Sequence, residues 1–227
     1  RCDLVHRDVN NFLVLTALIY FDMDFLVLRI LNYYSVTDPL KLYTIIRNYL
    51  LKKKTVKFNI HEQYYADTPL TMSIHKRFTK VALKLLEHPN ICEIGQINAQ
   101  GNTALMLTAE NNMSVVSLKL LEHQTKCKLD TVNKKGDTVL MIAIRSSLLE
   151  LVIKLLDHSD QCKCNQINNK GESALTLSLD KDLCHISHKL YNKDKSVEYL
   201  SLKQVDKLTK ILDSYAKLPK KNNHSSS

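Results

Sequence analysis

Residues 98–123 read NAQGNTALMLTAENNMSVVSLKLLEH, and the pattern of this stretch returns at fixed intervals along the chain. It recurs at residues 133–158 and, in a weaker form, at 168–191. It is also present earlier, where Asp-Thr-Pro-Leu at 67–70 opens a similar segment. The steps from residue 67 to 102, 137 and 172 are each 35 residues long. An internal repeat of this length predicts one supersecondary unit that stacks on copies of itself.

Each repeat predicts a tight turn followed by a pair of helices. Three of the four glycines end an Asn-x-x-Gly sequence, where they supply the positive φ of a tight turn: Gly101, Gly136 and Gly171. Two residues later stands a hydroxyl suited to an N-cap, at Thr68, Thr103, Thr138 and Ser173. Pro69 suits the first helical position, where no N–H is needed. An apolar second helix follows, with Val115, Val116, Leu118, Leu120 and Leu121 in the second repeat. The predicted fold class is therefore all-α.

These motifs resemble the ankyrin repeat, whose unit is a β-turn followed by two helices. The matching segments are DTPL at 67–70, GNTAL at 101–105, GDTVL at 136–140 and GESAL at 171–175. The resemblance implies an ankyrin-type solenoid with finger-like turns. The sequence departs from it in length, with 35 residues per unit instead of 33, and at two positions of the motif. The histidine usual after Thr-Pro-Leu is replaced by Thr71, Met106, Met141 and Thr176, so its hydrogen bond is expected to be lost. The glycine usual between the helices is absent, and Asn112 stands nearest to its place.

The repeat gives the expected domain organisation. Residues 1–62 are predicted as degenerate ankyrin-like helices, including one near 25–31, and residues 63–202 as four repeats, 63–97, 98–132, 133–167 and 168–202. Ser201 and Gln204 form a predicted capping box for a C-terminal capping helix over 203–217. One apolar face of that helix carries Leu202, Val205, Leu208, Ile211, Leu212 and Tyr215. The tail 218–227 is expected to be disordered. The chain begins with Arg1, so we expect it to be a piece of a longer protein.

Composition bounds the class of protein. The chain has 227 residues, of which 44% are apolar, which is enough for a core, and a formal net charge of +9. Its longest early apolar run, residues 12–21, is too short to span a bilayer. Cys92, Cys127 and Cys162 occupy one position in successive repeats, and stacked elements about 8–10 Å apart exceed the span of a disulfide. We therefore expect buried thiols in a cytoplasmic protein, acting in its own cell or inside a host cell.

Alternatives to this interpretation rest on weaker patterns. Leu140, Ile142 and Ile144 alternate as in a strand, although the helix cap and the repeat favour a helix. Cys164, Cys184 and His188 suggest a zinc site, but their spacing is not a common structural one and they stand in repeat columns. His88, His123 and His158 recur in the last turn of the second helix, which the helix dipole favours. No motif of catalysis or of cofactor binding is present, and we expect neither an enzyme nor a cofactor.

The resemblance implies that a partner docks on the turn tips and the exposed end of each first helix. These positions vary between repeats while the core columns do not. They are Tyr64, Tyr65, Asp67, His75, Lys76, Gln100, Asn102, Glu110, Asn111, Lys134, Lys135, Asp137, Arg145, Asn169, Lys170, Glu172 and Lys181. Tyr64 and Tyr65 are either aromatic anchors for the partner or packed under the preceding unit. Lys134, Lys135, Arg145 and Lys170 form a basic set that would steer an acidic partner.

We therefore expect a monomeric adaptor, scaffold or host-directed effector that binds another protein and has no small-molecule substrate. One alternative is a nucleic-acid or anionic-surface binder that uses the basic charge, which would show steep salt dependence. The lack of aromatic nucleic-acid motifs disfavours it. Another alternative is a regulatory fragment of a larger enzyme. Because ankyrin arrays bind unrelated targets, the fold alone does not name the partner.

Overall fold

The computed structural model describes residues 19, 24–33, 68–87, 93–158, 160–193 and 197–217. The regular structure of these residues is helical, apart from two isolated antiparallel β-bridges. This confirms the all-α class. The chain divides into two compact units, Arg1–Lys134 and Lys135–Ser227. The predicted N-terminal helices lie outside the described residues except for α2, which confirms the helix expected near 25–31. The tail 218–227 also lies outside them.

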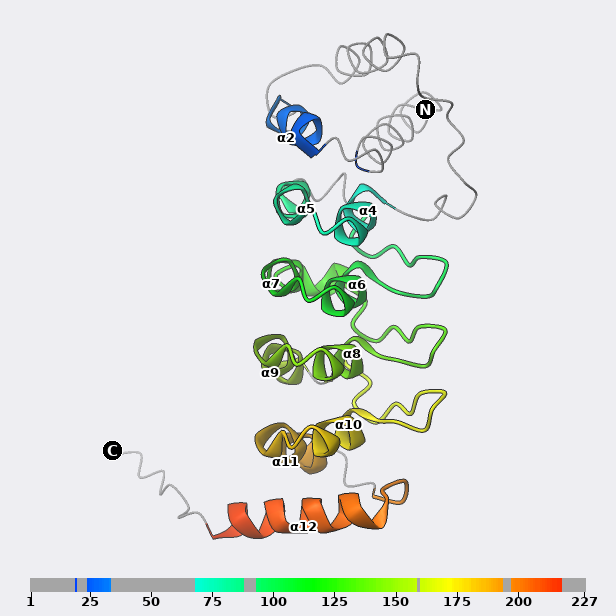
Figure 1. Cartoon of the computed structure of the whole chain (residues 1–227), viewed down its shortest axis with the longest axis vertical. Helices are drawn as coiled ribbons and strands as arrows, with labels where there is room; N and C mark the ends of the chain where they lie inside the picture. Colours follow the sequence, from blue (N-terminus) through cyan, green and yellow to red (C-terminus); the bar gives the residue numbers. More distant parts are fainter. Residues whose placement is uncertain are drawn as a thin grey trace, which may run out of the picture. The chain divides into compact units, whose positions relative to one another are not determined.

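The described residues of the first unit form two helical hairpins and one further α-helix. Within it α4 packs against α6, α5 against α7, and α2 against α5 (Figure 1). The hairpins are therefore stacked first helix on first helix and second on second. The elements are α2 (Asp24–Tyr33), α4 (Pro69–His75), α5 (Thr79–Leu86), α6 (Ala104–Glu110), α7 (Ser114–Leu121) and the 3-10 helix η2 (Gln124–Lys126).

The second unit contains two more hairpins and a longer C-terminal helix. Here α8 packs against α10, and α12 lies against both α10 and α11 (Figure 1). Ser201 and Gln204 form the expected capping box at the start of α12. The elements are α8 (Val139–Arg145), α9 (Leu149–Asp157), α10 (Ala174–Asp180), α11 (Cys184–Lys193) and α12 (Leu202–Ala216).

The first helix of each repeat begins where the sequence predicts. The side chains of Thr68, Thr103, Thr138 and Ser173 each accept the backbone N–H three residues later. Thr71 and Thr176 stand at the position of the usual histidine, where we expected a hydrogen bond to be lost. This expectation is wrong for both residues. Each hydroxyl accepts the backbone N–H of its cap residue at 2.8 Å. The short threonine side chain reaches back to the N-cap residue three positions earlier, so the hydrogen bond forms within the same helix turn.

The first helices are buried on all sides, and this explains their ambiguous sequence pattern. Residues 139–144 of α8 are all buried, including Leu140, Ile142 and Ile144. A short helix covered all round has no polar face and therefore no helical periodicity. The cap at Thr138 was the better guide, and the segment is a helix.

The corner between the two helices is left-handed in every described repeat. The residues there have positive φ without being glycine: Arg77 (56°), Asn112 (56°), Ser147 (58°) and Asp182 (56°). The position of Asn112 is the one at which the sequence departs from the glycine of the resemblance. The backbone conformation is thus kept although the glycine is lost.

The second helices and α12 are amphipathic. In α7, Val116, Leu120 and Leu121 are buried, but Val115 is 60% exposed. In α12, Leu208 and Ile211 are buried, whereas Leu202 is 87% exposed and Val205 is also exposed. The apolar face of α12 is therefore longer than the surface that covers it.

The cysteine column behaves as expected where it is described. Cys127 and Cys162 are buried free thiols, and burial raises the pKa of each to about 12. Their S–H groups donate to the carbonyls of Leu120 and Leu155, seven residues earlier. Cys92 lies outside the described residues.

Candidate partner-binding surface

An asparagine side chain closes the turn before α10. The Oδ1 atom of Asn168 accepts the backbone N–H groups of Lys170 and Glu172, both at 2.9 Å. Its carbonyl accepts the N–H of Gly171, whose φ is 78°, and its own N–H donates to the carbonyl of Glu172. Asn169 donates its N–H to the carbonyl of Lys135. Every backbone N–H from residue 168 to 172 is therefore hydrogen-bonded, although the segment lies outside the helices.

The turn before α6 is built in the same way. Asn98 Oδ1 accepts the N–H groups of Gln100 and Asn102 at 3.0 and 2.9 Å. The backbone carbonyl of Asn98 accepts the N–H of Gly101. Asn side chains commonly bond the backbone two residues on in this manner. The recurring Asn-x-x-Gly sequence is thus the chemical signature of a preformed turn.

Neighbouring turns within each unit are joined by a backbone hydrogen bond. Lys134 donates to the carbonyl of Gln100 in the first unit, and Asn169 to that of Lys135 in the second, both at 3.0 Å. The approach is close at the glycines. A Cβ on Gly136 would lie 2.8 Å from Cα of Asn168, and one on Gly101 would lie 3.0 Å from N of Lys134. These two glycines therefore provide both the positive φ and the space for the next turn.

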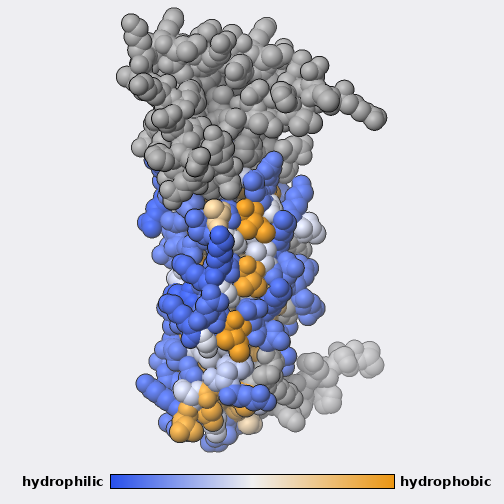
Figure 2. Space-filling model, turned by 90° about the vertical axis from the view of Figure 1, so that its right-hand side faces the viewer, coloured by the Kyte–Doolittle hydropathy of each residue, from blue (hydrophilic) through white to orange (hydrophobic). Residues whose placement is uncertain are grey.

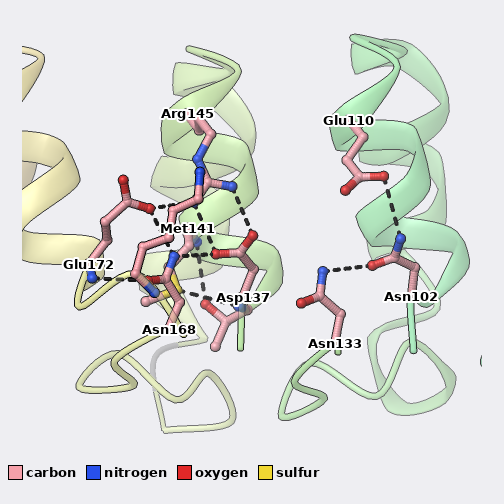
Figure 3. A network of polar contacts seen from close by, with 10 residues as sticks. Asn102, Glu110, Asn133, Asp137, Met141, Arg145, Asn168 and Glu172 are labelled. Atoms are coloured by element: carbon pink, nitrogen blue, oxygen red, sulfur yellow. Dashed lines mark hydrogen bonds and ion pairs between the residues drawn. The ribbon is translucent and has the colours of Figure 1, made fainter. Parts of the chain in front are cut away.

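A charged network lies behind the turns of the second unit (Figure 3). Arg145, at the end of α8, donates two hydrogen bonds of 2.9 Å to the two carboxylate oxygens of Asp137. Its Nη2 also donates to Oε2 of Glu172 at 3.0 Å. The amide of Asn168 donates to both carboxylates, at 2.7 Å to Asp137 and 2.8 Å to Glu172. One guanidinium and one amide thus link two successive turns and the helix between them.

The network sets the charge state of its buried carboxylate. Burial alone would raise the pKa of Asp137, but the hydrogen bonds from Arg145 and Asn168 and the charges of Arg145 and Lys135 together lower it. The hydrogen bonds from Arg145 to Asp137 in turn raise the pKa of Arg145. Asp137 is therefore an ionised, paired group whose role is structural.

The first unit has a counterpart of this network that is built from two amides and one carboxylate. Asn133 donates its amide to Oδ1 of Asn102 at 2.8 Å, and Asn102 donates to Oε2 of Glu110 at 3.4 Å (Figure 3). Glu110 occupies the repeat position of Arg145, and Asn102 that of Asp137. The same scaffold thus carries different charges in the two units.

The described residues of the predicted surface fall into three groups: buried, half-buried and exposed. Asn102 and Asp137 are only 5% and 2% exposed, so they support the turns from behind. Lys76, Asn111 and Glu172 are half-buried. Tyr64, Tyr65 and Asp67 lie outside the described residues. The exposed residues are His75, Gln100, Glu110, Lys134, Lys135, Arg145, Asn169, Lys170 and Lys181.

Two of the predicted residues contact the corner of a neighbouring repeat. Lys181 Nζ donates to the hydroxyl of Ser147 at 2.9 Å, and Arg77 Nε donates to Oδ1 of Asn111 at 3.4 Å. Among the predicted residues, then, the structure brings Asp137, Arg145 and Glu172 together, and Asn102 with Glu110.

Sequence reasoning missed two kinds of residue at this surface. Asn98, Asn133 and Asn168 hold the turns but are not among the predicted site residues, although the 35-residue recurrence of Asn-x-x-Gly is a signal that could have found them. Ile97 and Ile167, which form the two isolated bridges, are 39% and 43% exposed. Figure 2 views the side on which Figure 1 shows the turns, and its mainly hydrophilic surface carries separate apolar spots.

The residues of the zinc alternative take part in other contacts. The His188 ring stacks on Tyr215 of α12 with centroids 3.9 Å apart and planes 6° apart. The hydroxyl oxygen of Tyr215 is also hydrogen-bonded to Nδ1 of His185, at 3.2 Å. The Cys184 thiol donates to the carbonyl of Asp182. In the part of the chain that the structure describes, no three His, Cys, Asp or Glu side chains are grouped to hold a metal ion.

None of the described helices is both long enough and apolar enough to cross a membrane. No protein-family model matches this chain, and no curated protein matches it.

Proposed function

We propose that this protein is an ankyrin-type solenoid that binds another protein through its turn tips and carries out no chemistry. The all-α hairpins, the capped first helices and the stacked turns of each unit support this architecture. The free, buried thiols of Cys127 and Cys162 support a reducing, intracellular location.

The observation that carries the proposal is the fully bonded turn at residues 168–172. Its backbone is fixed by the side chain of Asn168 and by Lys135 of the preceding turn. The side chains of Asn169 and Lys170 are exposed on this fixed backbone, and that of Lys135 is exposed on the preceding turn. A surface that is ordered before binding loses less conformational entropy when a partner docks. Turns built in this way suit recognition, and their exposed residues are free to differ between repeats.

The charges favour an acidic partner for the second unit. Arg145 is already paired with Asp137 and Glu172, so it contributes less to steering than the sequence suggested. Lys135 and Lys170 are exposed at the tips and are the main source of positive potential there. Positive tips raise the rate of encounter with an acidic surface and select against basic ones.

The test is capture of partners from cytosol at moderate salt, identified by mass spectrometry. The test variant carries Lys135→Glu and Lys170→Glu. The control variant, Lys154→Glu with Lys163→Glu, makes the same change in net charge at exposed positions of the same unit. In Figure 1, Lys154 belongs to α9, which lies away from the turns.

We expect one protein to be enriched by the parent and by the control and lost with the test variant. Equal loss with both variants would contradict a role of the tips. Recovery of nucleic acid alone, released by salt to the same degree from all three proteins, would show non-specific binding by the net charge.

A further inference from the structure

The polar network of the second unit contains a carboxylate that can leave without disturbing the others. Asp137 is buried, with a side chain only 3% exposed, and both its oxygens are bound by Arg145. Glu172 is different, because its side chain is 34% exposed and a single oxygen, Oε2, takes both contacts. Asp137 is therefore a fixed, buried part of the network. Glu172 contacts the network from the side that faces solvent.

Removal of Glu172 would leave a pair of donors aimed at one point. Nη2 of Arg145 and Nδ2 of Asn168 converge on Glu172 Oε2 at 3.0 and 2.8 Å. Both donors are held in place independently of Glu172, since Asp137 binds Arg145 twice and also accepts from Asn168. A guanidinium and an amide placed in this way form a ready site for a carboxylate oxygen.

The backbone around Glu172 does not depend on its side chain. Its N–H is held by Asn168 Oδ1 and its carbonyl by the N–H of Asn168. The contact between its carboxylate and the 39% exposed side chain of Arg145 is open to solvent. Such exposed ion pairs contribute little to stability. Exchange of this carboxylate for another one therefore costs little.

We propose that Glu172 is an internal stand-in for an acidic side chain of the partner. An aspartate or glutamate on an acidic segment displaces Glu172 and binds Arg145 and Asn168, while Lys135 and Lys170 contact neighbouring acidic residues. This inference rests on the proposed function and specifies the chemistry that the partner presents. Glu172 then acts as a competitor that lowers the affinity for weakly acidic segments.

The experiment measures the binding of a fluorescein-labelled hexaglutamate peptide by fluorescence anisotropy, with unlabelled peptide as competitor. The variants are Glu172→Ala, which empties the donor pair, and Glu172→Gln, which keeps an oxygen acceptor there. Glu150→Ala is the matched control, because Glu150 is an exposed glutamate on α9 in the same unit. It changes the net charge by the same amount. Thermal melts establish that each variant is folded.

We expect Glu172→Ala to bind the peptide roughly three- to tenfold more tightly than the parent, which is the net size of one ordinary hydrogen bond at a solvent-exposed site. Glu172→Gln should show a smaller gain, and Glu150→Ala less than a twofold gain. Equal gains for Glu172→Ala and Glu150→Ala would overturn the inference, because they would show an effect of overall charge. Absence of any gain in Glu172→Ala at low salt would overturn it as well.

The two proposals fail in different ways. If Lys135→Glu with Lys170→Glu abolishes partner capture while Glu172→Ala has no gain, the tips bind a partner but Glu172 is only structural. If the lysine changes have no effect on capture, the proposed function itself is wrong, whatever the peptide shows.

Discussion

Ser147 illustrates how a single residue limits the stability of a repeat. It has φ 58° at the corner between α8 and α9, where a residue with a Cβ is strained and glycine is not. We expect Ser147→Gly to raise the free energy of unfolding by about 1 kcal/mol, less a small loss from the exposed hydrogen bond to Lys181. The shift of the urea midpoint measures this change.

The neighbouring residue provides the control. Ser146 caps α8 with φ −82°, an ordinary right-handed conformation. Ser146→Gly should therefore lower stability, by about 0.5 kcal/mol. If both substitutions lower stability alike, the left-handed corner is not a strained position.

The lowered pKa of Asp137 determines how the free energy of unfolding should depend on pH. Its pKa is lower in the folded state than in the unfolded chain, so the folded state binds fewer protons there. Its contribution is fully present above the unfolded pKa and is lost as pH falls through the folded one. We expect stability to fall in acid, below roughly pH 4, and Asp137→Asn to lose less stability over that range than the parent. Urea midpoints at several pH values compare the two proteins, and an unchanged acid slope in the variant would contradict the assignment.

Residue-level features were predictable when they depended on near neighbours in the chain. The Thr138 side chain accepts the N–H three residues ahead at the start of α8, and Gly136 has the positive φ that its turn requires. Local rules therefore predicted both. The burial of Asp137 depends on Arg145, eight residues away, and on Asn168, thirty-one residues away. No local pattern marks such a network, which is why Asp137 was expected on the surface.

At the level of elements, the turns predict a graded effect of glycine substitution. Gly136 and Gly171 have nearly the same φ, 81° and 78°. A Cβ on Gly136 would meet the backbone of the next turn at 2.8 Å, while one on Gly171 would meet nothing within 4 Å. We expect Gly171→Ala to cost about 1 kcal/mol, the left-handed penalty alone, and Gly136→Ala at least 1 kcal/mol more.

Chemical denaturation of the two variants tests this order. Because both substitutions have the same effect on the unfolded chain, the difference between them reports the contact with the next turn. Equal costs would show that the turns of this unit are not packed as closely as the structure has them.

The elements themselves were predicted better than their surfaces. The caps and the repeat located each first helix, whereas the strand-like alternation of Leu140, Ile142 and Ile144 was misleading because α8 is buried all round. The apolar face of α12 was predicted correctly as a pattern, but Leu202 at its start is exposed. Periodicity indicates which residues share a face. It does not indicate how far the neighbouring helices extend along that face.

On the scale of the whole molecule, the sequence repeat predicted the paired helices that the structure describes between residues 69 and 193. It did not predict that equivalent positions form an ion-paired network in the second unit and an amide–carboxylate network in the first, since that depends on which side chains meet. The turn tips could be located from the sequence repeat, and their role as a binding site stays a prediction. Which tip residues are exposed required the three-dimensional structure.

The proposed function requires that the turns are formed before any partner arrives. Amide hydrogen exchange of the free protein, followed by NMR, tests this most directly. The backbone N–H groups of residues 168–172 are all hydrogen-bonded, so we expect them to exchange at least tenfold more slowly than an unstructured peptide of the same sequence. Asn168→Ala should remove the protection of the Lys170 and Glu172 amides, which the Asn168 side chain accepts. Exchange of these amides in the parent at the rate of the unstructured peptide would show that the turns are not preformed, and would contradict the proposed recognition surface.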